Sequence, residues 1–249
     1  MRKLFEYPLS AITLLVLGLL LVFFHPIQVI SRNLFGYAAH KNTVDILNLF
    51  ILRSLWIMGA RISFHGFEHI PANRTLIIVA NHQSAYDVPP VIWGFRKYHP
   101  KFISKIELGK HIPSISYNLR YGGSVIIDRK SGSQSIKEIY KLGQWIAERH
   151  YSACLFPEGT RTKTGRVNKF HPAGFKALLR TAPGALVVPF VIDGNYQLQP
   201  KGLFPMRFGV RIRYTALEPI EPGNTPTEEL LEKIEMAIRE SVHSNASLH

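Results

Sequence analysis

Two apolar segments at the start of the chain predict a pair of helices that attach to a membrane. Residues Pro8–Phe24 form one apolar run without charged residues, and Val44–Met58 form a second run that contains Asp45, Asn48 and Arg53. A membrane-spanning helix needs about 20 apolar residues, and the first run is shorter than that. We therefore expect a helical hairpin that lies in the membrane plane or dips into one leaflet. A full span by the first helix, or a core helix for the second segment, are the alternatives that the pattern leaves open.

Beyond Gly59 the pattern changes to short apolar or alternating segments that predict strands. These segments are Arg61–Phe67, Thr75–Ala80, Lys101–Ser104, Ser124–Ile127, Ala153–Phe156, Leu186–Ile192 and Val210–Tyr214. The last segment alternates polar and apolar residues cleanly, so we expect it at an edge of the sheet. Helices are predicted from a capping box at Ser135–Glu138, over Gly174–Arg180, and from a second capping box at Thr225–Glu228. The alternation of strands and helices predicts an α/β fold with a mixed, largely parallel sheet flanked by helices.

Composition and charge narrow the possible functions. The 249 residues include 30 Lys and Arg against 17 Asp and Glu, a net charge of +13, so the chain favours anionic partners. Nucleic acid is not the predicted partner, because no recognisable module interleaves aromatic with basic residues. The single cysteine, Cys154, rules out a disulfide framework and a multi-cysteine zinc site, and its apolar strand predicts a buried, inert thiol. The letters of His65–His69 match a zinc motif, but they fall on a strand rather than a helix, so we predict no metal.

A histidine and an aspartate follow directly on the buried strand Thr75–Ala80. Ligands of open α/β sheets bind beyond the carboxyl ends of the strands, and His82 occupies that position. Asp87 lies five residues further on, and a turn between the two can bring its carboxylate against one imidazole nitrogen. Such a pairing fixes the tautomer and raises the basicity of the other nitrogen. The pattern therefore predicts a general base, although a loop-capping histidine and a helix-capping aspartate would fit the same spacing.

Basic residues follow three more predicted strands. The segment Phe156–Arg161 closes one of them with a Pro and Gly turn that carries Arg161, and a guanidinium can hold a phosphate through two parallel hydrogen bonds. Lys105 and Arg129 follow two other strands. Each position alone would suit a solvated basic loop, but together they predict an anion site beside the histidine.

The motifs in this order resemble those of the bacterial lysophospholipid acyltransferases, typified by 1-acyl-sn-glycerol-3-phosphate acyltransferase. The resemblance rests on an NHxxxxD block (Asn81, His82, Asp87), an Ile-Asp-Arg block (Ile127–Arg129), the complete FPEGTR block (Phe156–Arg161) and a Pro-centred block (Val187–Phe190). It covers roughly Arg61–Pro219. The chain departs from the family pattern at Ile126, and again after the third block, where it reads Phe170-His171-Pro172-Ala173-Gly174.

The resemblance implies a membrane-anchoring segment at residues 1–60 and a glycerolipid acyltransferase catalytic domain at residues 61–249. It implies transfer of a fatty acyl group from acyl-CoA or acyl-carrier protein to the free hydroxyl of a lysophospholipid, with no metal or other cofactor. The expected acceptor is 1-acyl-sn-glycerol-3-phosphate, and the product is then phosphatidic acid. His82 would act as general base and Asp87 would orient it. The substrate-binding set would comprise Lys105, Arg129, Glu158, Gly159, Thr160 and Arg161.

The same resemblance and the apolar start imply a location at the cell membrane, with the catalytic domain on the cytoplasmic side and membrane phospholipids as partners. Three alternatives stay open: an acceptor that is another lysolipid, such as an amino-acid lipid; a non-catalytic lipid-binding protein of the same fold; and a lipid hydrolase that uses Ser84 as nucleophile.

Overall fold

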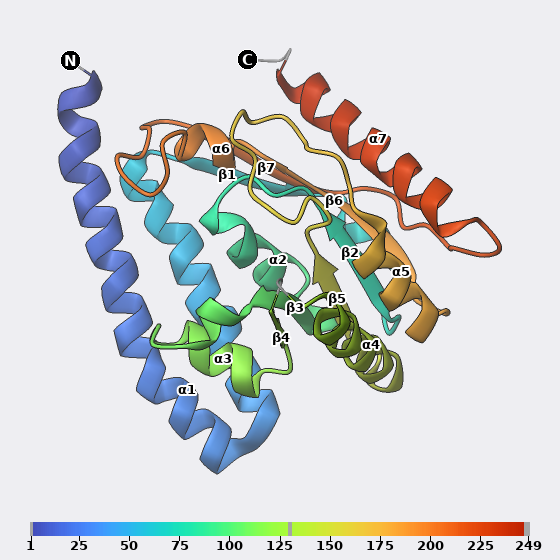
Figure 1. Ribbon diagram of the computed structural model, residues 1–249. Coiled ribbons are helices and arrows are strands. Elements are labelled where there is room, and N and C mark those ends of the chain that lie inside the picture. The colour runs from blue at the N-terminus through green and yellow to red at the C-terminus, as the bar shows by residue number, and fades with distance from the viewer. Residues whose placement is uncertain (1, 129–130, 247–249) are drawn as a thin grey trace.

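The N-terminal segment folds into a helical hairpin in the computed structural model, which describes residues 2–128 and 131–246. Helix α1 (Arg2–Ser54) is broken at Gly36, whose φ of 79° and ψ of −165° reverse the chain, so that two arms lie side by side (Figure 1). The Ser31 and Thr43 hydroxyls, 3.0 Å apart, join the arms near the turn. The predicted hairpin is confirmed, but its first arm continues through Pro26 to the turn and is far longer than the apolar run that predicted it.

Seven strands form one sheet in the described part of the chain. They are β1 (Arg61–His65), β2 (Leu76–Ala80), β3 (Pro100–Lys105), β4 (Val125–Ile127), β5 (Ser152–Leu155), β6 (Leu186–Asp193) and β7 (Arg211–Ala216). Their order in space is β1-β7-β6-β2-β5-β3-β4. Every neighbouring pair is parallel except β6 and β7, so the predicted mixed, largely parallel sheet is confirmed.

One strand lies elsewhere than predicted. The segment now seen as β7 was expected at an edge, but it pairs with β1 on one side and with β6 on the other. Its alternation arises because one face, with Ile212, Tyr214 and Ala216, is buried in the core while Arg211 on the other face is exposed. Alternation reports the two faces of a strand and carries no information about its two edges.

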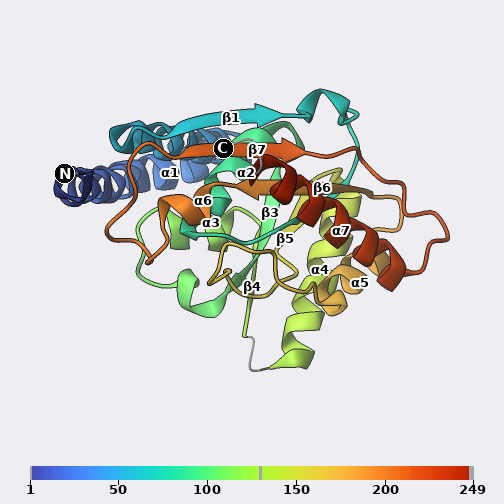
Figure 2. The same cartoon turned by 90° about the horizontal axis from the view of Figure 1, so that it is seen from above.

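Helices cover both faces of the sheet. The hairpin and α2 (Val88–Gly94) pack on one face, in a core shared with Leu76, Ile78 and Phe190. The other face carries α4 (Gly132–Arg149), α5 (Pro172–Thr181) and α7 (Thr227–Ala246), which bury Ile77 and Val79. Figure 2 shows α4 and α5 together on the side away from α1. Two short helices, α3 (Ile115–Tyr121) and α6 (Asn195–Leu198), complete the α/β layers.

The predicted start of α4 was wrong. The capping box placed it at Ser135, but the helix begins at Gly132 and the Ser135 hydroxyl donates a hydrogen bond to the Asp128 carbonyl oxygen, 2.8 Å away. The capping pattern in the sequence is therefore used for a contact to the preceding loop.

Candidate active site

The loop after β2 begins at a residue that is locked to the neighbouring strand. The Asn81 side chain donates to the Ile192 carbonyl oxygen and accepts from the Ile192 amide, both at 2.8 Å. Because β6 runs parallel to β2, this double contact fixes where the chain leaves the sheet. The next residue, His82, therefore lies at the carboxyl end of β2, as predicted.

His82 and Asp87 form the predicted pair. The imidazole Nδ1 lies 2.7 Å from the Asp87 Oδ2, and the short helical turn Ala85–Asp87 brings the carboxylate back toward the ring. Asp87 is fully buried, whereas the His82 side chain is 20% exposed. This contact engages Nδ1, so Nε2 is the nitrogen through which the ring can act on a ligand.

The Asp87 carboxylate is surrounded by donors. Its Oδ2 also accepts the amides of Gln83 and Ser84, at 2.5 and 2.9 Å. Its Oδ1 accepts the Asn195 side-chain amide at 2.7 Å and the Ser84 hydroxyl at 3.4 Å. These bonds replace the water that burial removes from the carboxylate, which keeps it in place beside the histidine.

The FPEGTR segment packs directly against the histidine. The Phe156 ring stacks on the His82 ring, with 4.4 Å between the ring centroids and 23° between the planes. The Glu158 carboxylate accepts the backbone amides of His82 and Asn168, at 2.6 and 2.8 Å. Burial raises the pKa of Glu158, and these two amide contacts oppose the shift. Glu158 thus joins the loop after β5 to the loop after β2, a contact that the sequence did not predict.

The other predicted substrate-binding residues lie at the same end of the sheet. Lys105 ends β3 with an exposed side chain, and Thr160 and Arg161 are exposed on the loop after β5. Gly159, with a φ of 69°, makes the turn between them and Glu158. Since β2, β5 and β3 are parallel neighbours, their carboxyl ends share one edge. Arg129 lies outside the described residues.

Two buried polar residues of the site, Asn195 and Tyr214, were not predicted from the sequence. Asn195 and Tyr214 extend the hydrogen-bond chain behind Asp87, because the Tyr214 hydroxyl donates to the Asn195 Oδ1 at 2.9 Å. Asn195 follows β6 in the same way that His82 follows β2, which is the signal that could have found it. Tyr214 carries no such signal, since it lies within a strand.

Ser84 and Cys154 are not placed to act as nucleophiles. The Ser84 hydroxyl is buried, accepts the Tyr86 amide at 2.9 Å and contacts Asp87, so it caps the turn. The predicted buried thiol is confirmed: Cys154 is enclosed within β5, and burial raises its pKa, with the nearby Asp87 charge adding to the effect.

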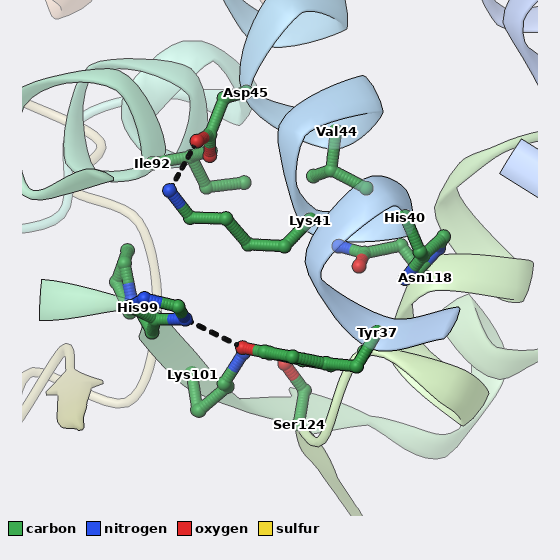
Figure 3. Close-up of a pocket in the computed structure, with 12 residues that line it drawn as sticks. Tyr37, His40, Lys41, Val44, Asp45, Ile92, His99, Lys101, Asn118 and Ser124 are labelled. Carbon is green, nitrogen blue, oxygen red and sulfur yellow. Dashed lines mark hydrogen bonds and ion pairs between the residues drawn. The ribbon is translucent and has the colours of Figure 1, made fainter. Parts of the chain in front are cut away.

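A cavity of about 20 Å³ lies at the opposite end of the sheet, where the second hairpin arm meets the start of β3 (Figure 3). The Lys101 ammonium donates to the Tyr37 hydroxyl at 2.7 Å, the His99 Nδ1 lies 3.0 Å from the same oxygen, and Lys41 pairs with Asp45. Burial lowers the pKa of Lys101 to about 7 and that of His99 to about 4. These contacts hold the hairpin to the sheet and lie apart from the His82 site.

Comparisons with known proteins show that this fold is that of an acyltransferase family. A sequence model of the Acyltransferase family matches residues 61–193, more than half of the chain, and the chain belongs to that family. The crystal structure of the 1-acyl-sn-glycerophosphate (LPA) acyltransferase PlsC from Thermotoga maritima is similar over 99% of this chain and 98% of that one, with a TM-score of 0.82 and 26% identity.

Curated 1-acyl-sn-glycerol-3-phosphate acyltransferases are also similar. The Cocos nucifera protein is 27% identical over 73% of this chain and 57% of its own length. The alpha form from Homo sapiens is 26% identical over 62% of this chain and 53% of its own length. The chain therefore spans somewhat more than half the length of these two relatives.

Proposed function

We propose that the protein is an O-acyltransferase that moves a fatty acyl group from acyl-CoA or acyl-carrier protein to the free hydroxyl of 1-acyl-sn-glycerol-3-phosphate, giving phosphatidic acid. The observation that carries this proposal is the 2.7 Å contact between His82 and Asp87 at the carboxyl end of β2, within the segment that matches the Acyltransferase family. The names of the relatives supply the acceptor.

The pair supports direct transfer by general-base catalysis. His82 Nε2 removes the proton from the acceptor hydroxyl while Asp87 stabilises the imidazolium that forms. The hydroxyl oxygen attacks the thioester carbonyl carbon, the carbon–sulfur bond breaks, and the leaving thiolate takes the proton from His82. No acyl-enzyme is needed, in keeping with the buried capping role of Ser84. A general base contributes about 10²–10⁴-fold, so holding both substrates in place supplies much of the remaining acceleration.

The acceptor phosphate is assigned to the basic residues at the same edge. Arg161, Lys105 and the turn at Gly159 would hold it, with Thr160 beside them. Arg129, which the motif resemblance also assigns to this set, lies outside the described residues. Glu158 contributes indirectly, because its carboxylate holds the loop that carries His82. The chain's excess positive charge favours both an anionic head group and an anionic leaflet.

The hairpin supports attachment to a membrane. Helix α1 is apolar enough to cross a bilayer, and only 17% of its most apolar window is buried in the protein, whereas a core helix would be mostly buried. The loop at residues 201–208 extends this apolar surface, since Phe204 is exposed and its ring packs on Tyr7 at 5.6 Å. We assign the protein to the cytoplasmic side of the cell membrane, with the hairpin embedded in one leaflet and membrane phospholipids as its surroundings.

The test uses the purified full chain in nanodiscs, with labelled acyl-CoA or acyl-carrier protein and a panel of lysolipids. We expect thiol release coupled to formation of phosphatidic acid, and product identification by mass would reveal another acceptor if the altered segment at Phe170–Gly174 selects one. His82→Ala is expected to lose about 10²–10⁴-fold in kcat while it stays membrane-associated. Absence of thiol release with every lysolipid would refute an acyltransferase, and full activity of His82→Ala would remove the proposed base.

A further inference from the structure

A chain of buried hydrogen bonds runs from the β7 strand to the candidate base. The Tyr214 hydroxyl donates to the Asn195 Oδ1 at 2.9 Å, the Asn195 Nδ2 donates to the Asp87 Oδ1 at 2.7 Å, and the Asp87 Oδ2 meets the His82 Nδ1 at 2.7 Å. Tyr214, Asn195 and Asp87 are all fully enclosed by the protein.

The chemistry of these groups fixes the direction of each hydrogen bond. The ionised Asp87 carboxylate can only accept, so the Asn195 amide must present its nitrogen to Asp87. The Asn195 oxygen then faces Tyr214, whose hydroxyl must donate to it. Burial raises the pKa of Tyr214, with the charge of Asp87 adding to the effect, so the phenol stays protonated as that donor. Tyr214 therefore selects the amide orientation that serves Asp87.

The backbone is built to bring Asn195 to this place. Gly194 has a φ of 93°, and a Cβ atom there would collide with the carbonyl oxygen of Arg211 on β7. Only glycine allows the turn after β6 to approach β7 so closely. The turn places Asn195 at the start of α6, between Tyr214 and Asp87.

We propose that Asn195 and Tyr214 are positioning residues for the acyl transfer, which act by holding the Asp87 carboxylate in the orientation that points His82 Nε2 at the acceptor hydroxyl. This inference rests on the proposed function. Without Asn195, the contact that Oδ1 keeps among the described residues is the Ser84 hydroxyl at 3.4 Å, while the Gln83 and Ser84 amides still hold Oδ2. The carboxylate can then turn about Oδ2, which changes the direction of the hydrogen bond to the imidazole. Both side chains are fully buried and cannot contact a substrate, so we expect substrate affinity to stay close to that of wild type.

The experiment compares Asn195→Ala, Tyr214→Phe and the double variant in nanodiscs. Tyr98→Phe is the matched control, because the Tyr98 hydroxyl is also buried and donates to the Ile70 carbonyl oxygen at 2.9 Å, away from Asp87. We expect Asn195→Ala to lose about 10- to 100-fold in kcat, the size of loss seen when residues that orient the ligands of metal sites are removed. We expect both KM values to stay within about twofold of wild type. We expect a smaller loss for Tyr214→Phe and no loss for Tyr98→Phe.

The double variant tests whether the two residues act in series. If Tyr214 works through Asn195, the double variant is as slow as Asn195→Ala alone, whereas independent effects would multiply. A second readout is the low-field NMR resonance of the His82 Nδ1 proton. We expect this resonance in the spectra of wild type and Tyr98→Phe. We expect it to be broadened or shifted in Asn195→Ala, a change that a general loss of stability would not cause.

Two results would overturn the inference: wild-type kcat with an unchanged resonance in the folded Asn195→Ala variant, or multiplicative losses in the double variant. If Asn195→Ala fails to fold, the Tyr214→Phe variant serves as the test, because it removes only the hydroxyl oxygen and keeps the buried ring. Wild-type kcat and resonance in Tyr214→Phe would then refute the role. Failure of the proposed function is distinguishable, because wild type would then release no thiol with any lysolipid, or His82→Ala would keep full activity. Failure of this inference alone leaves wild type active and His82→Ala inactive.

Discussion

Glu158→Gln tests how the FPEGTR segment supports the catalytic loop. The two carboxylate oxygens accept the backbone amides of His82 and Asn168. A glutamine side chain keeps one acceptor oxygen for one of these two backbone amides but presents its NH₂ group to the other. One hydrogen bond to a charged group is therefore lost, and one buried backbone N–H is left without an acceptor. A hydrogen bond to a charged group is worth about 1.5–3 kcal/mol. For a chain of this length that loss lowers Tm by about 3–12 °C.

The kinetic consequence separates support of the loop from substrate binding. If Glu158 holds the loop that carries His82, kcat falls in Glu158→Gln while the acceptor KM stays within about twofold. The matched control is Glu235→Gln, because the Glu235 carboxylate accepts the Phe170 amide at 2.7 Å and does not contact His82. We expect the control to lose stability without loss of kcat. An unchanged Tm together with a tenfold rise in acceptor KM would refute this reasoning and favour direct contact with the acceptor.

The dependence of stability on pH gives a second readout for Glu158. Its pKa in the folded protein lies above the ordinary value of about 4.3, so the folded state binds more protons than the unfolded state in the range just above that value. The stability contribution of Glu158 therefore falls as the pH rises through the raised pKa. Denaturant titrations across this range are expected to show the slope in wild type and to lose it in Glu158→Gln.

Three further predictions follow from the same contacts. Arg161→Ala is expected to raise the acceptor KM about tenfold or more, because a charge-assisted contact to phosphate is lost, and the acyl-donor KM much less; equal effects on both would argue against phosphate binding at this residue. Relative to wild type, which has three native tryptophans, Phe204→Trp is expected to add fluorescence that brominated lipids quench. Met236→Trp, at an exposed position on α7, is expected to add fluorescence that they do not quench, and equal quenching of the two would contradict the proposed membrane surface. The pKa of Lys101 falls from 10.5 to about 7 on folding, so the contribution of Lys101 to stability rises with pH between these two values, by at most about 1.4 kcal/mol per pH unit. Urea titrations at several pH values should show this slope in wild type and not in Lys101→Met. A slope that persists in the variant would assign it to another group.

The amino-acid sequence determined the features that depend on short stretches of chain. The apolar runs predicted the hairpin, and the strand and helix periodicities predicted the layers of the fold. His82 and Asp87 are five residues apart, so a single turn can join them, and the pair was predicted together with its hydrogen bond. The exposed strand ends with Lys105 and Arg161 were found in the same way, since a polar residue directly after a buried strand is visible in the sequence.

Only the tertiary structure decided which distant residues complete the site. Glu158 meets a backbone amide 76 residues earlier in the chain, and Asn195 meets a carboxylate 108 residues earlier. The place of β7 inside the sheet, and the burial of Lys101 beneath the hairpin, likewise depend on how strands from different parts of the chain are ordered. Local patterns record which face of an element is buried, but the partner of a buried polar group is chosen by packing across the whole sheet, and no local pattern contains that information.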